Sequence, residues 1–117
     1  MTRIIVCGGR DFTNEAFIYG KLDAFHARHG VVALMHGGAS GVDRIASEWG
    51  KSKGIPRFRC EALWETHGRS AGPRRNARML EWGPDFVIAF PGNRGTNDMV
   101  SKALAAGVPL VDYRNNA

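Results

Sequence analysis

Three glycine-rich turns carry the residues in this chain that are most able to do chemistry. Each turn follows a short apolar run typical of a buried strand and leads into a segment with helical character. They read Gly8-Gly9-Arg10-Asp11, Gly37-Gly38-Ala39-Ser40-Gly41 and Pro91-Gly92-Asn93-Arg94-Gly95-Thr96. Glycine lets the backbone approach an anion closely, and a helix start supplies unpaired N–H groups with partial positive charge. Three such turns in 117 residues predict a shared cleft for a phosphorylated small molecule.

Polar side chains in and beside these turns would complete such a cleft. Arg10 offers a planar guanidinium that suits phosphate, although it could instead form a local ion pair with Asp11. Ser40 could donate to a phosphate, and Asp43 could bind a ribose hydroxyl or only stabilise the first turn of its helix. The hydroxyl of Thr96 and the neighbouring N–H groups are predicted to hold a phosphate, and Thr96 is also expected to cap its helix.

A second set of candidates lies outside the glycine turns. Arg75 and Asn76 follow Pro73, which suits the first turn of a helix, and both are interpreted as ligand-facing residues. Trp64 belongs to the irregular stretch 61–71, where it could stack on a base as part of a lid or pack into the core. The chain shows no metal-binding spacing, and no cofactor is expected.

The elements that must position these residues follow from the apolar pattern. Apolar runs predict five strands, at 3–7, 31–35, 57–60, 85–90 and 109–112. Caps and amphipathic spacing predict helices between them, from a cap at residue 13 or 14 to Gly30, and at 42–53, 73–82 and 96–106. This alternation predicts an α/β protein: a single Rossmann-like three-layer domain with a five-stranded, mainly parallel sheet in the order 3-2-1-4-5 and helices on both faces.

That strand order also predicts where the cleft lies. Strands 1 and 4 are neighbours at the topological switch point, and ligands of such sheets bind at the carboxyl ends of the strands there. The Gly8 turn and the Gly92 turn should therefore face each other. We expect one domain over residues 1–114 and a short polar tail at 115–117.

Net charge and hydropathy limit the classes of binding partner that we expect for this protein. The net charge of +5 and the isoelectric point near 9.8 favour an anionic partner, either a nucleotide or nucleic acid. The apolar run at 4–7 is too short for a signal peptide, and no run approaches the ~20 residues that span a bilayer. We therefore expect a cytoplasmic protein with no membrane partner. Cys7 and Cys60 are interpreted as reduced, buried thiols.

Several stretches together carry a family resemblance. The third turn, Pro91-Gly92-Asn93-Arg94-Gly95-Thr96, resembles the P-G-G-x-G-T-x-x-E motif of LOG-type proteins. The YspA-type members of the SLOG superfamily are similar at Gly8-Gly9-Arg10-Asp11-Phe12, His36-Gly37-Gly38-Ala39-Ser40-Gly41-Val42-Asp43 and Ala71-Gly72-Pro73-Arg74-Arg75-Asn76. The match covers nearly the whole chain. It implies a compact Rossmann-like fold that binds nucleotides or nucleotide-derived ligands.

The resemblance also implies candidate catalytic residues. Some relatives are phosphoribohydrolases, which release a base from a nucleoside 5′-monophosphate. Their arginine falls on Arg75, and the terminal glutamate of the motif falls on Met99. Methionine cannot hold a proton, so the adjacent Asp98 is the candidate replacement. Neighbours on a helix point about 100° apart, so Asp98 could serve only if the helix start is shifted.

Three functions follow from these observations. The leading one is a nucleotide or nucleotide-derivative binding protein, such as a sensor. The second is a hydrolase of the N-glycosidic bond of nucleoside 5′-monophosphates, which needs a carboxylate near the ribose, from Asp11, Asp43 or Asp98. The third is a single-stranded nucleic-acid binder that uses Trp64 and the arginines of residues 69–78, with steep salt dependence. The resemblance also implies a homo-oligomer, in which a partner subunit could complete each site.

Overall fold

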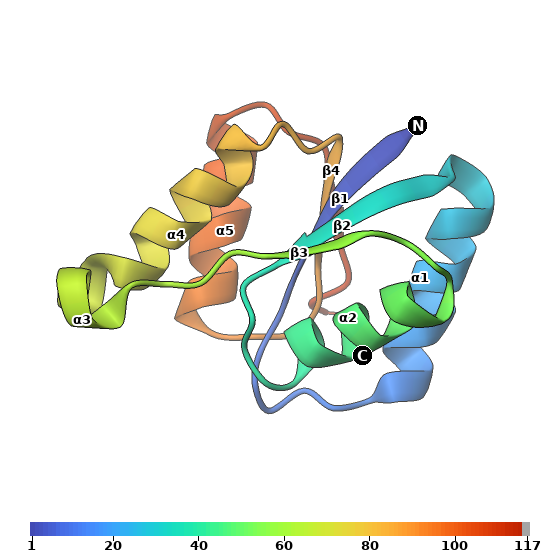
Figure 1. Cartoon of the computed structure of the whole chain (residues 1–117), viewed down its shortest axis with the longest axis horizontal. Coiled ribbons are helices and arrows are strands. Elements are labelled where there is room, and N and C mark those ends of the chain that lie inside the picture. The colour runs from blue at the N-terminus through green and yellow to red at the C-terminus, as the bar shows by residue number, and fades with distance from the viewer. Residues whose placement is uncertain (116–117) are drawn as a thin grey trace.

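The computed structural model describes residues 1–115, in which strands and helices alternate along the chain. Residues 116 and 117 of the expected tail lie outside the described residues. The elements, shown in Figure 1, are β1 (Thr2–Cys7), α1 (Glu15–His29), β2 (Val31–His36), α2 (Val42–Ser52), β3 (Arg57–Arg59), α3 (Trp64–His67), the 3-10 turn η1 (Gly68–Ser70), α4 (Ala71–Glu81), β4 (Phe86–Ala89), α5 (Arg94–Ala105) and β5 (Leu110–Asp112).

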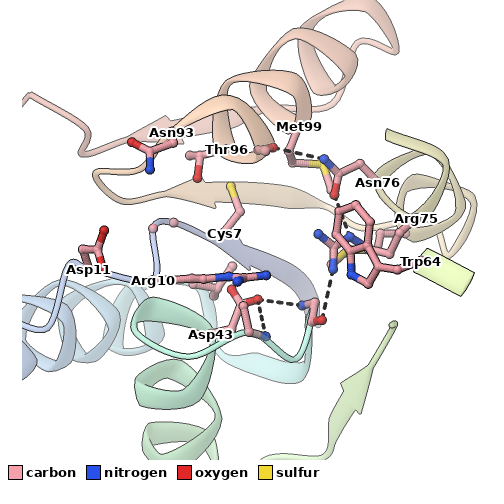
Figure 2. A pocket seen from close by; sticks show the side chains of 17 residues that line it. Cys7, Arg10, Asp11, Asp43, Trp64, Arg75, Asn76, Asn93, Thr96 and Met99 are labelled. Atoms are coloured by element: carbon pink, nitrogen blue, oxygen red, sulfur yellow. Dashed lines mark hydrogen bonds between the residues drawn. The ribbon is translucent and has the colours of Figure 1, made fainter. Parts of the chain in front are cut away.

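The strands form one sheet in which every neighbouring pair is parallel. Its order is β3-β2-β1-β4-β5, so the predicted fold class and strand order are confirmed. Ile5 of β1 pairs with Met35 of β2 on one side and with Val87 of β4 on the other. The turn after β1 consequently lies beside the turn after β4, as the switch-point argument predicts (Figure 2).

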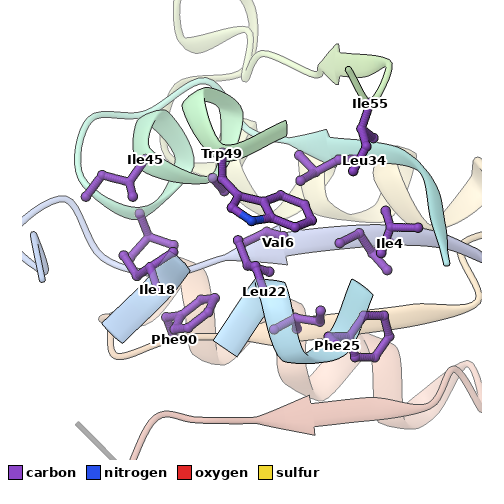
Figure 3. Close-up of a cluster of buried hydrophobic side chains, with 14 residues drawn as sticks. Ile4, Val6, Ile18, Leu22, Phe25, Leu34, Ile45, Trp49, Ile55 and Phe90 are labelled. Carbon is purple, nitrogen blue, oxygen red and sulfur yellow. The ribbon is translucent and has the colours of Figure 1, made fainter. Parts of the chain in front are cut away.

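One face of the sheet is covered by α1 and α2. Side chains from both helices pack on Ile4 and Val6, which point to this face because alternate residues of a strand share a side. Trp49 of α2 is completely buried, and its indole N–H donates to Asp23 Oδ1 over 2.8 Å. Figure 3 shows this indole directed from α2 towards β1. The face is therefore a close-packed core that holds the start of α2 in place.

The opposite face is covered by α4 and α5 (Figure 1). Ile5 and Val87 of the sheet pack there against Met79 of α4 and against Met99 and Ala103 of α5. The five side chains are buried. This second core fixes the two helices whose first turns reach the carboxyl ends of the strands.

The caps predicted for α1 agree with the structure, whereas the N-cap predicted for α5 does not. Asn14 caps α1, since its Oδ1 accepts from the Phe17 N–H, and Gly30 ends that helix with a φ of 65°. The prediction that Thr96 caps the last helix is wrong, because α5 already begins at Arg94. Its N-cap is Asn93, whose side chain makes no capping hydrogen bond.

The edge strand β3 is short and exposed, as its alternating sequence predicts. Among the helices of residues 1–115, none is both long enough and apolar enough to cross a membrane.

The described core can be tested by comparing a buried tryptophan, Trp49, with an exposed one, Trp64. We expect Trp49→Ala to lower the free energy of unfolding by about 3–5 kcal/mol, because it empties a fully buried site. The same substitution at Trp64, which is 54% exposed, should change it by less than about 1 kcal/mol. Urea unfolding of the two variants measures both values, and similar losses in the two would contradict the assigned burial.

Candidate functional site

A cavity of about 300 Å³ opens at the carboxyl ends of the central strands, where the three turns meet (Figure 2). It brings together most of the residues singled out from the sequence. Those that line it are Gly8, Gly9, Arg10, Asp11, Gly37, Ala39, Asp43, Trp64, Arg75, Asn76, Asn93, Gly95 and Thr96. Side chains from α2, α4 and α5 thus converge on one space, although they are far apart in the sequence.

The other candidate residues lie outside the cavity lining. Gly41 and Gly92 permit close backbone contacts: a Cβ on Gly41 would lie 2.4 Å from the Gly9 carbonyl oxygen, and one on Gly92 would lie 2.1 Å from Thr96 Oγ1. Gly38 and Ser40 line a neighbouring hollow with the side chains of the β3 edge. The remaining two are Pro91 and Asp98.

The first turn is held between its neighbours, and its Gly9 N–H is not open to a ligand. The Gly9 N–H donates to the Pro91 carbonyl over 2.8 Å, and the Val42 N–H donates to the Gly9 carbonyl over 3.2 Å. The turn therefore acts as a fixed wall. Its contribution to the cavity is the exposed pair Arg10 and Asp11, which stand at the rim.

In the second turn, the N–H groups of Gly37, Gly38 and Ala39 are already occupied. Gly37 and Ala39 both donate to Asp43 Oδ2, over 3.2 and 3.1 Å, and Gly38 donates to His36 Nδ1 over 3.0 Å. Three successive donors that could cradle a phosphate are satisfied within the protein. What this turn presents to the cavity is the carboxylate of Asp43.

Burial raises the pKa of Asp43 to about 6, well above its ordinary value of 3.8. Four neighbouring groups lower this pKa, because each favours the ionised form: the Ala39 N–H, Arg75, the Gly37 N–H and Arg10. The side chain is only 6% exposed. A carboxyl group that titrates near neutral pH in a cleft between two arginines is typical of a functional site.

The third turn leaves its donors open. The first hydrogen bond of α5 runs from the Asn97 N–H to the Asn93 carbonyl over 3.0 Å. The N–H groups of residues 94–96 precede that bond and find no acceptor within residues 1–115. Thr96 is only 4% exposed, and its hydroxyl borders the cavity without a hydrogen bond to another lining residue (Figure 2).

A chain of hydrogen bonds fixes Arg75 against the second turn. Its Nη1 donates to the Gly37 carbonyl over 3.0 Å, and its Nε donates to Asn76 Oδ1 over 2.9 Å. The Asn76 amide nitrogen donates in turn to the Gly95 carbonyl and to Asp98 Oδ2, over 3.1 and 3.0 Å. Asn76 is 3% exposed and its amide is fully engaged, so it positions Arg75 and the start of α5.

Asp98 is held away from the cavity. Besides the bond from Asn76, its Oδ1 accepts from Lys102 Nζ over 2.5 Å. Met99, at the position of the family glutamate, faces the cavity instead and is almost fully buried. The helix start is therefore not shifted in the way that would aim Asp98 at a ligand.

The cavity floor is apolar and was not predicted. Val6, Cys7, Met79 and Met99 form it. Met79 lies four residues after Arg75 on α4, and that spacing could have revealed a shared face. Burial, and next the Asp43 carboxylate, raise the pKa of the Cys7 thiol to about 12. At neutral pH this free thiol stays protonated and is a weak nucleophile.

Trp64 stands at the cavity rim on α3, within the stretch that the sequence left irregular. More than half of its surface is exposed, and Figure 2 shows its indole beside Arg75. The alternative of packing in the core is therefore wrong for this residue. Its aromatic face is available to a flat ligand group.

A parallel sheet in the order 3-2-1-4-5 with a cavity at its switch point defines the class of Rossmann-like α/β proteins. The chain belongs to the YspA, cpYpsA-related SLOG family (YAcAr), whose model matches residues 2–67, and this confirms the YspA-type resemblance. Family membership associates it with nucleotide-related binding or processing.

A curated relative, the Gene 61 protein of Mycobacterium phage D29, is 32% identical over 121 aligned residues, which cover 97% of each chain. Its name indicates no activity. No solved structure matches the chain significantly.

The raised pKa of Asp43 predicts a pH-dependent stability. Between about pH 4 and pH 6 the folded protein binds this proton and the unfolded chain releases it, so the free energy of unfolding falls as pH rises through that window. Two pKa units correspond to roughly 3 kcal/mol. Asp43→Asn keeps an oxygen for both backbone donors and cannot titrate. We therefore expect the wild-type protein to lose about 2–3 kcal/mol relative to this variant between pH 4 and pH 7.

Urea unfolding of both proteins across this pH range measures the effect. His36, whose pKa is lowered by burial, titrates in both proteins and cancels in the difference. A difference that stays constant with pH would contradict the assignment to Asp43.

Proposed function

We propose that the chain binds a nucleoside 5′-phosphate, or a derivative of one, with the phosphate at the start of α5. The observation that carries this proposal is the open set of donors there, the N–H groups of residues 94–96 and the Thr96 hydroxyl, with Gly95 and Thr96 lining the cavity. The partial positive charge at the N-terminus of a 12-residue helix favours an anion at the same place.

The charge distribution in the cavity supports one phosphate position over the others. Arg10 and Arg75 supply positive charge in the same cavity; Arg75 is held against Gly37, and both lie near Asp43. The ionised Asp43 repels a phosphate from the second turn, where the N–H groups are already used. A single 5′-phosphate at α5 therefore satisfies the donors without meeting the carboxylate.

Trp64 supports a nucleoside as the remainder of the ligand. Its exposed indole at the rim offers a stacking face, and stacking of a base on an aromatic side chain contributes about 1–3 kcal/mol. The apolar floor of Val6, Met79 and Met99 suits the uncharged face of a sugar or base. A phosphate at one end and a flat ring at the other together describe a nucleotide.

The two alternative functions have less support. Hydrolysis of the N-glycosidic bond would rely on Asp43 or on Asp11 at the rim, because Met99 cannot act as an acid or base and Asp98 is bound by Asn76 and Lys102. Binding of single-stranded nucleic acid would use the arginines of residues 69–78, of which Arg75 alone lines the cavity. Arg74 and Arg78 donate to Ser70 Oγ and to the Glu61 carbonyl.

Removal of the Thr96 hydroxyl tests the phosphate site. Isothermal titration with the four ribonucleoside 5′-monophosphates should show binding of at least one of them, and binding of its unphosphorylated nucleoside should be far weaker. We expect Thr96→Val to weaken the binding of that monophosphate by roughly 10- to 100-fold, since it loses a hydrogen bond to a charged group. The matched variant Thr13→Val removes a hydroxyl from an exposed residue outside the cavity and should bind as the wild type does.

A second pair of variants separates a local from a general effect of charge. Arg10→Gln should weaken binding several-fold, whereas Arg28→Gln, which removes the same charge from the far end of α1, should not. Equal losses in both variants, together with a steep loss of affinity with salt, would favour nucleic-acid binding instead. Chromatography of the titrated samples detects any released base, which would support the hydrolase.

A further inference from the structure

Asp43 has one carboxylate oxygen whose role the fold does not explain. Both backbone hydrogen bonds that it receives end on Oδ2, and Oδ1 receives none from residues 1–115. Arg75 and Arg10 lie near enough to lower its pKa, yet neither forms an ion pair with it. Asp43 is only 6% exposed, and Figure 2 shows its side chain pointing into the cavity beside Arg10.

The carboxylate belongs to a built site around the peptide units of Gly37. The Gly37 N–H donates to Asp43 and the Gly37 carbonyl accepts from Arg75, so one residue holds both side chains. A Cβ on Gly37 would lie 2.1 Å from Arg75 Nη1 and 3.1 Å from Asp43 Oδ2. This close packing leaves Oδ1 little freedom to turn away from the cavity.

None of the buried side-chain oxygens in the described residues lacks a hydrogen-bond partner, so Oδ1, which receives no hydrogen bond, stays open to the cavity and can accept one from a ligand group that donates. A phosphate dianion has no proton to donate, and its charge is repelled by an ionised carboxylate. The hydroxyls of a ribose can donate, since each offers one O–H, and a charged acceptor makes such bonds stronger.

The position of Asp43 fits the sugar of the nucleotide. The turns after β2 and β4 flank β1, and two strand spacings place them roughly 10 Å apart. A ligand whose phosphate lies at the α5 start and whose base lies on Trp64 must place its sugar between them, within reach of the α2 start.

We propose that Asp43 Oδ1 accepts hydrogen bonds from the 2′- and 3′-hydroxyls of the ligand's ribose and makes the cavity selective for ribonucleotides. This inference rests on the function proposed above, because it takes the phosphate position as given. It adds what the phosphate site alone does not supply: discrimination between ribose and deoxyribose. Such discrimination is strong where a buried polar group is left unpaired by the analogue.

The experiment compares adenosine 5′-monophosphate with its 2′-deoxy and 3′-deoxy analogues, and repeats the comparison with the guanosine, cytidine and uridine series. Isothermal titration of the wild-type protein should show a preference of roughly 10- to 100-fold for the ribonucleotide. Asp43→Asn should lose most of this preference by weakening the ribonucleotide, while the deoxy analogues keep their affinity within a few-fold. Circular dichroism checks that the variant is folded.

Glu81→Gln is the matched control, since it removes the same charge from an exposed residue at the end of α4 that does not line the cavity. It should keep the ratio between ribonucleotide and deoxynucleotide. Equal binding of ribonucleotides and deoxynucleotides by the wild type, or an unchanged preference in Asp43→Asn, would overturn the role of Asp43 and leave the phosphate site standing. Absence of binding by every 5′-monophosphate in the panel would overturn the proposed function and this inference with it.

Discussion

The close packing of the β1 turn between its two neighbours is the constraint on which the rest of the site depends. A Cβ on Gly8 would lie 2.5 Å from Val42 Cγ2, and one on Gly9 would lie 2.9 Å from Gly92 Cα. Only residues without side chains can bring the turns after β1 and β4 and the start of α2 this close. The hydrogen bonds from Gly9 N–H to the Pro91 carbonyl and from Val42 N–H to the Gly9 carbonyl then fix the three segments as one wall. The cavity exists because the helices that carry its side chains start from this wall.

The three glycine turns look alike in sequence and differ in what they present. In the first, the glycine N–H is used to join the turns. In the second, the N–H groups solvate an internal carboxylate, so the turn presents negative charge. In the third, the helix begins without a side-chain cap and its donors face the cavity. The number of glycines therefore does not decide whether a turn can bind an anion. The destination of each backbone N–H does, and an asymmetric ligand, negative at one end and rich in hydroxyls in the middle, fits the resulting arrangement.

The fold was predictable because the signals that specify it are local. Short apolar runs separated by amphipathic segments allow few topologies once crossovers are right-handed. The predicted helix at 42–53 corresponds to α2, and the edge position of β3 followed from its alternating residues. The site was less predictable, because its details depend on contacts between distant segments. Nothing in the sequence shows that Asp43 turns back onto Gly37 and Ala39, or that Asn76 joins Arg75 to the start of α5. The sequence predicted the cap of α5 at the wrong residue, Thr96, for the same reason. The start of α5 depends on a distant contact, the packing of the β4 turn on Gly9.

The exchange of a glutamate for Met99 acquires a physical meaning once the opposite wall of the cavity is considered. The motif of the LOG-type proteins implies a carboxylate on the α5 side. Here that side holds a buried thioether, and the carboxylate that faces the cavity is Asp43, on the α2 side. Two ionised carboxylates in so small a space would repel each other and the phosphate, and each would raise the pKa of the other. Asp11 stands at the exposed rim, so Asp43, whose pKa burial raises to about 6, is the one buried carboxyl of the cavity lining, and Arg10 and Arg75 place positive charge near it. In the function proposed above, Asp43 hydrogen-bonds the sugar of a nucleotide and does not activate water against it.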